Sequence, residues 1–184
     1  MKFTFLAVSV VLMMVSCSEI RSTPRNSKMS SNDESVKVSA QEYENTLVIN
    51  EYCVKNRSEN GEKKKADWFE IYNSSDRDIT LNSGEWSVTD DLDKPEKFYL
   101  PEMTIESKGY IVIWCDGKDK ITDKVHTNFK LNASGESIGI FYMGELVDAV
   151  TYEAALTENV SYGRIQDGSE EWTTFEIASI GYSN

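Results

Sequence analysis

From Leu47 onward, short runs of aromatic and β-branched residues alternate with turn-forming residues, and no stretch keeps a helical period. The predicted strands are residues 47–49, 68–72, 86–88, 97–100, 110–114, 137–142, 146–152 and 172–175. Residues 143–145, Met-Gly-Glu, join two of these runs closely, as a glycine-containing hairpin loop does. About eight short strands at this spacing predict an all-β fold, an antiparallel sandwich or barrel.

One predicted strand carries two different faces. A period of two places Phe69 and Ile71 on one side and Trp68, Glu70 and Tyr72 on the other. If the aliphatic side is the core, the second side forms an aromatic stripe that points outward and could bind a partner protein or a glycan. The alternative is that a neighbouring loop or the end of the chain covers this stripe.

The N-terminal apolar run has the parts of a targeting signal. Residues 3–15 are apolar or small, follow Lys2, and end before Ser16 and Cys17. The run is too short to cross a bilayer core, which needs roughly 20 helical residues. A basic start, an apolar middle and a small residue before the break predict a secretory signal peptide over residues 1–16.

Residues 14–17, Met-Val-Ser-Cys, resemble the lipobox of bacterial lipoproteins, in which the cysteine receives diacylglycerol and becomes the new N-terminus. The resemblance implies lipid on Cys17 and a membrane-anchored exported protein, on the periplasmic or surface face of a bacterial outer membrane. Because such proteins carry more than one acyl chain, the anchor would be stable. The alternative is an ordinary secreted protein in which Cys17 is incidental.

A polar segment separates this cysteine from the predicted strands. Residues 17–46 are rich in Ser, Asn and charged residues and hold few apolar ones. Such a segment cannot bury enough surface to offset its ordering entropy, which predicts a flexible tether. The expected organisation is therefore a signal peptide at 1–16, a lipidated tether at 17–46 and one domain at 47–184.

The chain is strongly acidic. Its formal net charge is −12, and removing residues 1–16 takes away one Lys and no acid, which gives −13. This charge disfavours unaided binding to nucleic acid, so we expect no nucleic-acid partner. The one basic run, Lys63-Lys64-Lys65, lies in a Gly- and Asn-flanked segment that is typical of a solvated turn.

An ordered series of short motifs resembles the bacterial lamin-tail domain. The motifs are Asn50-Glu51, residues 67–73 (Asp-Trp-Phe-Glu-Ile-Tyr-Asn), residues 84–90 around Trp86, residues 109–116, residues 126–131 (His-Thr-Asn-Phe-Lys-Leu), Gly135-Glu136, Val147-Asp148, residues 161–164 and Asp167-Gly168. The resemblance covers residues 47–184, with Ser179-Ile180-Gly181 where the family usually has Thr-Pro-Gly. It implies an immunoglobulin-like antiparallel β-sandwich used for attachment and interaction.

Few residues suggest catalysis. His126 is the single histidine, and no nucleophile-elbow serine or phosphate-binding glycine loop occurs. In the family's His-Thr-Asn-Phe segment, His126 is expected to have a hydrogen-bonded structural role. Glu51, Asp67 and Glu70 could act as an acid and base pair, but nothing in their spacing shows that they converge. We therefore expect a non-catalytic protein.

Acidic loops offer a weak calcium hypothesis. The candidate ligands are Asp90, Asp91 and Asp93 in one predicted loop and Asp116 and Asp119 in another. Carboxylate oxygens suit calcium, but neither loop has the spacing and glycine of an EF-hand. Solvated acidic loops are the alternative, so calcium is the one cofactor considered.

Two cysteines remain after Cys17. Cys53 and Cys115 could form a disulfide in an exported protein, or could stay as buried free thiols. Sequence does not show whether their Cα atoms come within the roughly 7 Å that a bridge requires.

Arg164 and Asp167 lie close together near Gly168. They could form an anion or substrate site, but a tight turn of this composition favours a structural role in which the side chains tie the loop together.

The expected function is a lipid-anchored interaction module of the cell envelope that binds a protein or a glycan. The alternatives are a structural component of an envelope assembly and a small hydrolase that uses carboxylates.

Overall fold

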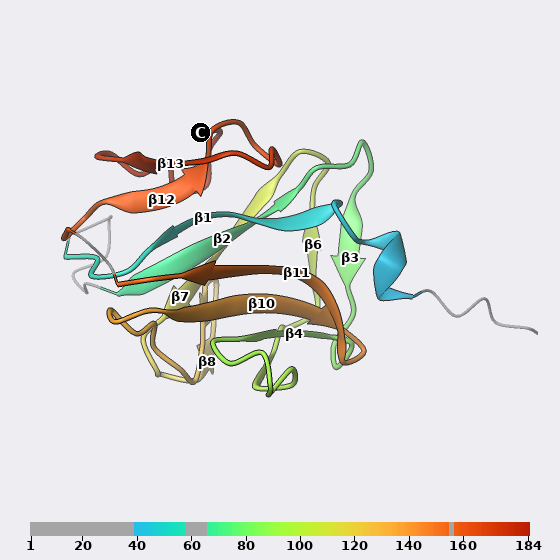
Figure 1. Cartoon of the computed structure of the whole chain (residues 1–184). Helices are drawn as coiled ribbons and strands as arrows, with labels where there is room; N and C mark the ends of the chain where they lie inside the picture. Colours follow the sequence, from blue (N-terminus) through green and yellow to red (C-terminus); the bar gives the residue numbers. More distant parts are fainter. Residues whose placement is uncertain (1–38, 58–65, 155–156) are drawn as a thin grey trace, which may run out of the picture. The chain divides into compact units, whose positions relative to one another are not determined.

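The computed structural model describes residues 39–57, 66–154 and 157–184. A short 3₁₀ helix precedes thirteen strands (Figure 1). The elements are η1 (Ala40–Glu42), β1 (Leu47–Cys53), β2 (Asp67–Asn73), β3 (Ile79–Leu81), β4 (Trp86–Thr89), β5 (Phe98–Tyr99), β6 (Met103–Ile105), β7 (Tyr110–Cys115), β8 (Lys120–Ile121), β9 (Val125–His126), β10 (Glu136–Tyr142), β11 (Glu145–Tyr152), β12 (Ser161–Arg164) and β13 (Trp172–Phe175).

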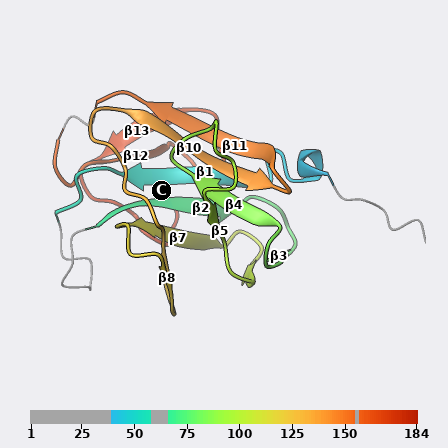
Figure 2. The same cartoon turned by 90° about the horizontal axis from the view of Figure 1, so that it is seen from below.

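The described strands form three sheets. A seven-stranded sheet has the order β13-β12-β1-β2-β7-β9-β8, and a four-stranded sheet has the order β11-β10-β4-β5. The third sheet pairs β3 with β6. All neighbours are antiparallel except β7 and β9. Figure 2 shows the β10–β11 pair lying over β1 and β2, so the two larger sheets form a sandwich and the predicted fold class is confirmed.

The core lies between the two larger sheets, where alternate side chains from each meet. Phe69 and Ile71 of β2 enter it from one side, and Val88, Ile138 and Ile140 enter it from the other. All five are at most 1% exposed. Fully burying a side chain of this kind contributes about 1.5–3 kcal/mol, which makes this apolar layer the main stabilising contact between the sheets.

A bulge interrupts the pairing of β1 with β2. The register pairs Ile49 with Ile71 and then Glu51 with Glu70, so Asn50 is an extra residue in β1. Beyond the bulge, Glu51 turns to the outer face of the seven-stranded sheet. The bulge therefore decides which face the acidic side chain reaches.

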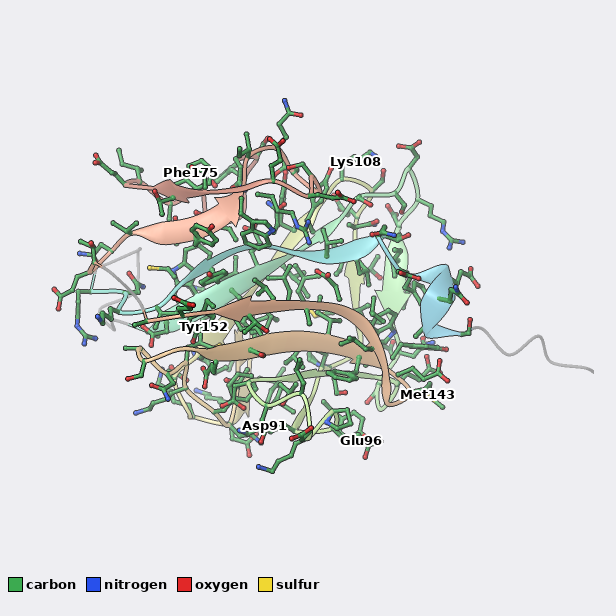
Figure 3. The ribbon with its side chains drawn as sticks, viewed as in Figure 1. Asp91, Glu96, Lys108, Met143, Tyr152 and Phe175 are labelled. Atoms are coloured by element: carbon green, nitrogen blue, oxygen red, sulfur yellow. The ribbon has the colours of Figure 1, made fainter. Side chains whose placement is uncertain are left out.

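The predicted hairpin loop between β10 and β11 is confirmed. Tyr142 pairs with Glu145, and the two central residues, Met143 and Gly144, have φ of 52° and 81°. Positive φ at both positions is the mark of a type I′ turn, which suits the twist of the flanking strands. Met143 lies at the tip of this hairpin (Figure 3).

Five strands escaped the prediction from sequence. β3, β6, β8 and β9 have only two or three residues, too few to show a period. β12, expected to be part of a tight turn, pairs with β1 and β13 instead. Its sequence, Ser-Tyr-Gly-Arg, has no aliphatic residue, so alternation gave no signal.

The folded domain begins before Leu47. Ala40 is 3% exposed and belongs to the core, and the Tyr43 ring lies 4.7 Å from the Trp86 ring and 5.1 Å from the Tyr142 ring. The predicted tether boundary at residue 46 therefore falls inside a packed segment. The predicted signal peptide, Cys17 and the rest of the predicted tether lie outside the described residues.

Within the described residues, no helix has the length and apolar character needed to cross a membrane.

Candidate functional site

The stripe on β2 is buried. Its faces alternate as expected, because Phe69 and Ile71 belong to the main core while Trp68 belongs to a second apolar cluster. However, Trp68 and Glu70 are each 0% exposed and Tyr72 is 7% exposed. In this arrangement the stripe is therefore covered, and these three side chains do not form an outward-facing platform.

Residues 177–184, here called the covering segment, lie over this face. Ala178 and Ile180 pack against the cluster that contains Trp68. The turn before β13 adds Gly168, where an added Cβ would lie 3.5 Å from the Tyr72 ring. The alternative drawn from the sequence, that the end of the chain covers the stripe, agrees with this arrangement.

Three carboxylates meet under the covering segment. Glu51 pairs with Glu70 across β1 and β2, and both are 0% exposed. The bulge residue Asn50 donates from Nδ2 to Glu70 Oε1 at 3.4 Å and to Asp167 Oδ1 at 2.9 Å. Ser161 Oγ donates to Glu51 Oε1 at 2.5 Å. We call Glu51, Glu70 and Asp167 the carboxylate cluster.

The covering segment supplies donors to this cluster. Ser179 donates to Glu51 Oε2 from its hydroxyl at 3.0 Å and from its backbone N–H at 3.3 Å. The Gly181 N–H donates to Glu70 Oε2 at 2.6 Å. The two glutamates are thus partnered by neutral groups from both side chains and backbone.

Asp167 ties the segment to the rest of the domain. It accepts a hydrogen bond from the Asn184 N–H at 3.2 Å and another from the Tyr110 hydroxyl at 2.7 Å. Asn184 Nδ2 donates to the Arg164 carbonyl at 2.7 Å. One carboxylate therefore connects β7, the turn before β13 and the covering segment.

Burial changes the protonation of the cluster. It raises the pKa of Glu70 to about 8 and raises the pKa of Glu51, against hydrogen bonds that lower both. Burial also acts to raise the pKa of Asp167, but hydrogen bonds led by those from Ser183 and Tyr110 outweigh it and leave that pKa lowered. At neutral pH, Glu70 therefore carries a proton and Asp167 is ionised.

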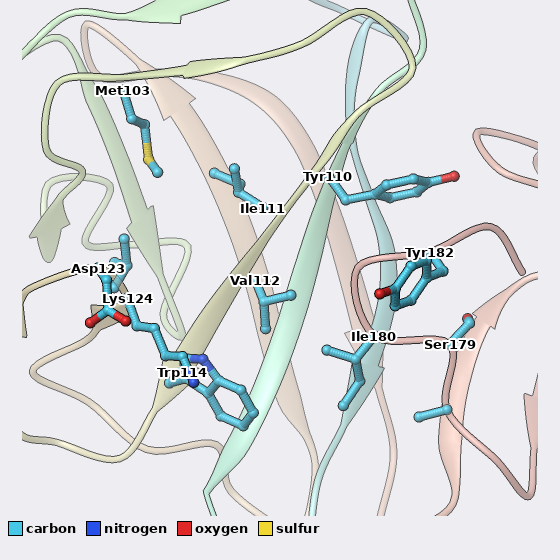
Figure 4. Close-up of a pocket in the computed structure, with 12 residues that line it drawn as sticks. Met103, Tyr110, Ile111, Val112, Trp114, Asp123, Lys124, Ser179, Ile180 and Tyr182 are labelled. Atoms are coloured by element: carbon cyan, nitrogen blue, oxygen red, sulfur yellow. The ribbon is translucent and has the colours of Figure 1, made fainter. Parts of the chain in front are cut away.

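A groove lies beside the covering segment. It has a volume of about 630 Å³ and runs along the outer face of β7 (Figure 4). Its lining residues are Met103, Tyr110, Ile111, Val112, Trp114, Asp123, Lys124, Val125, Ala178, Ser179, Ile180 and Tyr182. Figure 4 shows Val112 and Trp114 on one wall with Ile180 and Tyr182 across from them. We call this feature the β7 groove.

The β7 groove combines apolar walls with a charged rim. Tyr182 is 76% exposed, whereas Trp114 is 8% exposed and has Lys124 Nζ 5.8 Å from its ring centroid. Asp123 lies next to Lys124 at the same rim. An apolar pocket with a few polar groups is the usual form of a ligand site.

Of the three carboxylates considered for acid and base chemistry, two converge. Glu51 and Glu70 face each other, whereas Asp67 accepts a hydrogen bond from the Asn56 N–H at 3.0 Å at the far end of β2. The covering segment excludes solvent from the converged pair, since both side chains are 0% exposed.

The two cysteines are free and buried, which agrees with the alternative of buried free thiols and not with a disulfide. Cys53 pairs with Trp68 and Cys115 with Asp67, so β2 lies between them. Strands lie about 4.8 Å apart, which separates the two backbones by about 10 Å, beyond the reach of a disulfide. They also face opposite sides of the sheet, because Cys115 lies in the main core and Cys53 in the cluster with Trp68.

Three of the five candidate calcium ligands pair with lysine side chains. Asp90 pairs with Lys97, Asp91 Oδ2 with Lys94 Nζ at 2.7 Å, and Asp116 with Lys118. The Asp93 N–H donates to Asp91 Oδ1 at 3.2 Å, and the Asp119 N–H donates to the Thr127 carbonyl at 3.1 Å. In the part of the chain that the structure describes, no group of three or more His, Cys, Asp or Glu side chains is arranged to hold a metal ion.

His126 and Arg164 have structural contacts. His126, the last residue of β9, has its Nδ1 2.9 Å from Oδ2 of Asp116, the residue that follows β7. Arg164 donates to the Ile49 carbonyl at 2.8 Å, pairs with Asp148 at 3.3 Å and lies over the Trp172 ring. Arg164 thereby links β12 to β1 and β11, so it is unavailable as an anion site in this arrangement.

Sequence reasoning missed the covering segment as a site element. Ser179, Gly181 and Tyr182 follow the last predicted strand and have no periodic pattern. A signal did exist, because an outer face carrying Trp68 beside Glu70 needs either solvent or a cover, and a buried glutamate needs donors.

Comparison with known proteins adds a family. The model of the lamin tail domain family matches residues 40–154, which is more than half of the chain. The matched span contains Glu51, Glu70 and the whole of β7, and it ends before β12. No curated protein matches the chain.

Proposed function

The chain belongs to the lamin tail domain family, and we propose that it is a non-catalytic binding module of the cell envelope, held at a membrane by lipid on Cys17. Membership of this family supports a β-sandwich that interacts with another molecule. The single observation that carries a binding role is the β7 groove, whose apolar walls open to solvent beside the exposed Tyr182. The ligand is a protein or a glycan of the envelope.

The proposed anchor rests on the sequence of the N-terminus. The apolar run at residues 3–15, ending in Ser16 and Cys17, supports export followed by cleavage before the cysteine. Two or more acyl chains would hold the domain at the membrane in a way that one chain does not. The outer membrane is the proposed location.

Burial of the acidic pair favours binding over catalysis. General acid and base groups must come within about 3 Å of the reacting atoms of a substrate. Glu51 and Glu70 are 0% exposed, and their oxygens already accept hydrogen bonds from the covering segment. The β7 groove holds an aspartate and a lysine but no histidine or cysteine among its lining residues.

The anchor is tested by intact mass and membrane fractionation. The native protein should have the mass of a chain that begins at an acylated Cys17 and should fractionate with membranes. A Cys17→Ala protein should lose both properties, whereas a Ser18→Ala protein should keep them. An unmodified, soluble native chain would refute the anchor.

The binding role is tested by photo-crosslinking in intact cells. A photoreactive residue at Tyr182, on the rim of the β7 groove, should give one discrete adduct. The matched control is Ile177, which is 88% exposed in the same segment but does not line the groove. The Tyr182 adduct should disappear when Val112→Glu places a charge on the groove wall. Equal adducts at both positions, or an adduct that persists in the Val112→Glu chain, would refute the groove as the binding site.

A further inference from the structure

We propose that the surface beneath residues 177–184 is a peptide-binding site, which this segment occupies until an extended, basic segment of a partner protein displaces it. This proposal rests on the interaction role proposed above and specifies the chemistry of the partner. It differs from the groove alone, because the ligand would contact the carboxylate cluster that the segment now covers.

The covering segment binds the sheet as a peptide ligand does. It has no strand or helix over its length, and it reaches Glu51 and Glu70 through the backbone N–H groups of Ser179 and Gly181 and through the Ser179 hydroxyl. Any extended peptide offers the same backbone donors, so this mode of contact is independent of most of the segment's own side chains.

Few apolar contacts hold the segment down. Only Ala178 and Ile180 pack against the cluster beneath, and both are half-buried. Ile177 and Tyr182 are 88% and 76% exposed. A segment with so little apolar burial belongs to the part of a fold that opens before the core does.

With residues 177–184 in place, two groups on the surface beneath them lack a favourable partner. Among the described residues, no lysine or arginine forms an ion pair with Glu51, and the segment itself contains no basic residue. In addition, Trp68 Nε1 is fully buried beneath the segment without a hydrogen-bond partner among the described groups. An unpartnered buried donor is unfavourable, so another occupant that brings an acceptor would bind it better.

Charge complementarity identifies the partner segment as basic. A Lys or Arg side chain in place of Ser179 would bring a cation to Glu51, whose carboxylate now accepts hydrogen bonds from neutral donors. Hydrogen bonds to charged groups are about twice as strong as neutral ones. Val112 and Trp114, the wall of the β7 groove that remains when the segment leaves, would contact the apolar side chain that follows the basic residue.

The test uses synthetic peptides and the full chain. The probes are the peptide of residues 177–184 and its Ser179→Lys and Ser179→Glu versions. The chain carries Gly181→Ala, which loosens the segment because Gly181 has φ of +77°, while nothing lies within 4 Å of the added Cβ. When residues 177–184 are loosened, a larger fraction of the chains has this surface open. The apparent affinity of the chain for the peptides should therefore rise.

We expect the Ser179→Lys peptide to bind the Gly181→Ala chain about tenfold more tightly than the unmodified peptide does. The Ser179→Glu peptide should not bind. Adding Glu51→Gln to the same chain should abolish the preference for lysine. An Ile177→Ala chain is the matched control, and it should bind no better than the unaltered chain because Ile177 is exposed.

Hydrogen exchange keeps the test independent of any variant. In the unaltered chain, the Gly181 amide should exchange much faster than the Ile71 amide, since only the segment opens. Equal exchange of the two amides would overturn the proposal, as would failure of every peptide to bind a folded Gly181→Ala chain. If the Gly181→Ala chain forms dimers in sedimentation, the surface binds residues 177–184 of a second copy. That result would overturn the proposal of a basic partner segment.

The adduct at Tyr182 tests the proposed binding function separately from the displacement of residues 177–184. If the peptides fail while the adduct at Tyr182 persists, the β7 groove remains the binding site and only the displacement of residues 177–184 is wrong. If the adduct fails as well, the proposed function is wrong too.

Discussion

Glu51 on β1 and Glu70 on β2 stand directly opposite each other, and neither is exposed to solvent. Two like charges opposite each other in a sheet are destabilising. The structure reduces this effect in two ways. Burial raises both pKa values, so that a proton is retained, and donors from Ser161, Ser179 and Gly181 partner the oxygens. The stability of the domain should therefore depend on pH at this pair.

Glu70→Gln should change that dependence. Burial holds the pKa of Glu70 at about 8 in the folded chain, against about 4.3 when unfolded. Between these values the folded state binds more protons, so stability falls as pH rises. The glutamine cannot ionise, and the variant should therefore gain stability relative to the parent as pH rises from 5 to 9.

The measurement is the melting temperature of both proteins across that pH range. Glu145→Gln is the control, because Glu145 is exposed on the edge strand β11. A difference between parent and Glu70→Gln that stays constant from pH 5 to pH 9 would show that Glu70 does not titrate as described.

Ser161→Ala should destabilise the domain by about 1–3 kcal/mol, because it removes a donor from the buried Glu51 carboxylate. Urea unfolding would measure the change. Ser137→Ala removes a hydroxyl that contacts Thr151 at 2.8 Å on the surface, and it should cost about 0.5 kcal/mol or less. Equal losses for the two variants would contradict the importance of burial.

Cys53 and Cys115 should be unreactive in the folded protein and both free in the unfolded one. Burial raises the pKa of Cys53 to about 12 and the pKa of Cys115 well above its usual value. A thiol reagent at pH 8 should therefore label neither until denaturant is added without reductant. Labelling of neither cysteine in the unfolded, unreduced chain would reveal the disulfide that the sheet geometry excludes.

Tyr43→Ala should destabilise the domain by about 1–3 kcal/mol, because Tyr43 packs edge-on against Trp86 and contacts Tyr142. Thermal unfolding would measure the loss. Glu44→Ala, at the exposed neighbouring position, should have little effect. If both substitutions are neutral, Tyr43 belongs to the tether and not to the domain.

The sequence predicted those features in which burial and period agree. In β2, Phe69 and Ile71 alternate with polar or aromatic neighbours, and the structure follows that alternation. In β1, the bulge at Asn50 breaks the alternation, which is why only residues 47–49 were expected to form a strand that reaches Cys53. The match to the lamin tail domain family supports the fold class without relying on the alternation of strand residues.

The site depended on contacts that no local pattern contains. Glu51 and Ser179 meet across 128 positions of the chain, and Asn50 and Asp167 across 117. Their meeting requires the order of strands in the seven-stranded sheet, which alternation alone does not give. The sequence could show that the outer face of β2 is unusual, but it could not choose between a partner and the chain's own end.

The extra residue in β1 also determines how the domain tolerates changes in length. Core positions in β1 are odd-numbered up to Ile49 and even-numbered from Tyr52 onward, because Asn50 shifts the alternation by one. Deleting Asn50 would remove the extra residue and leave Glu51 on its present outer face, opposite Glu70, but it would also remove the side chain that donates to Glu70 and Asp167. A single-residue deletion elsewhere in this strand would instead turn the side chains on one side of the deletion to the opposite face, so it should be far more harmful than deletion of Asn50.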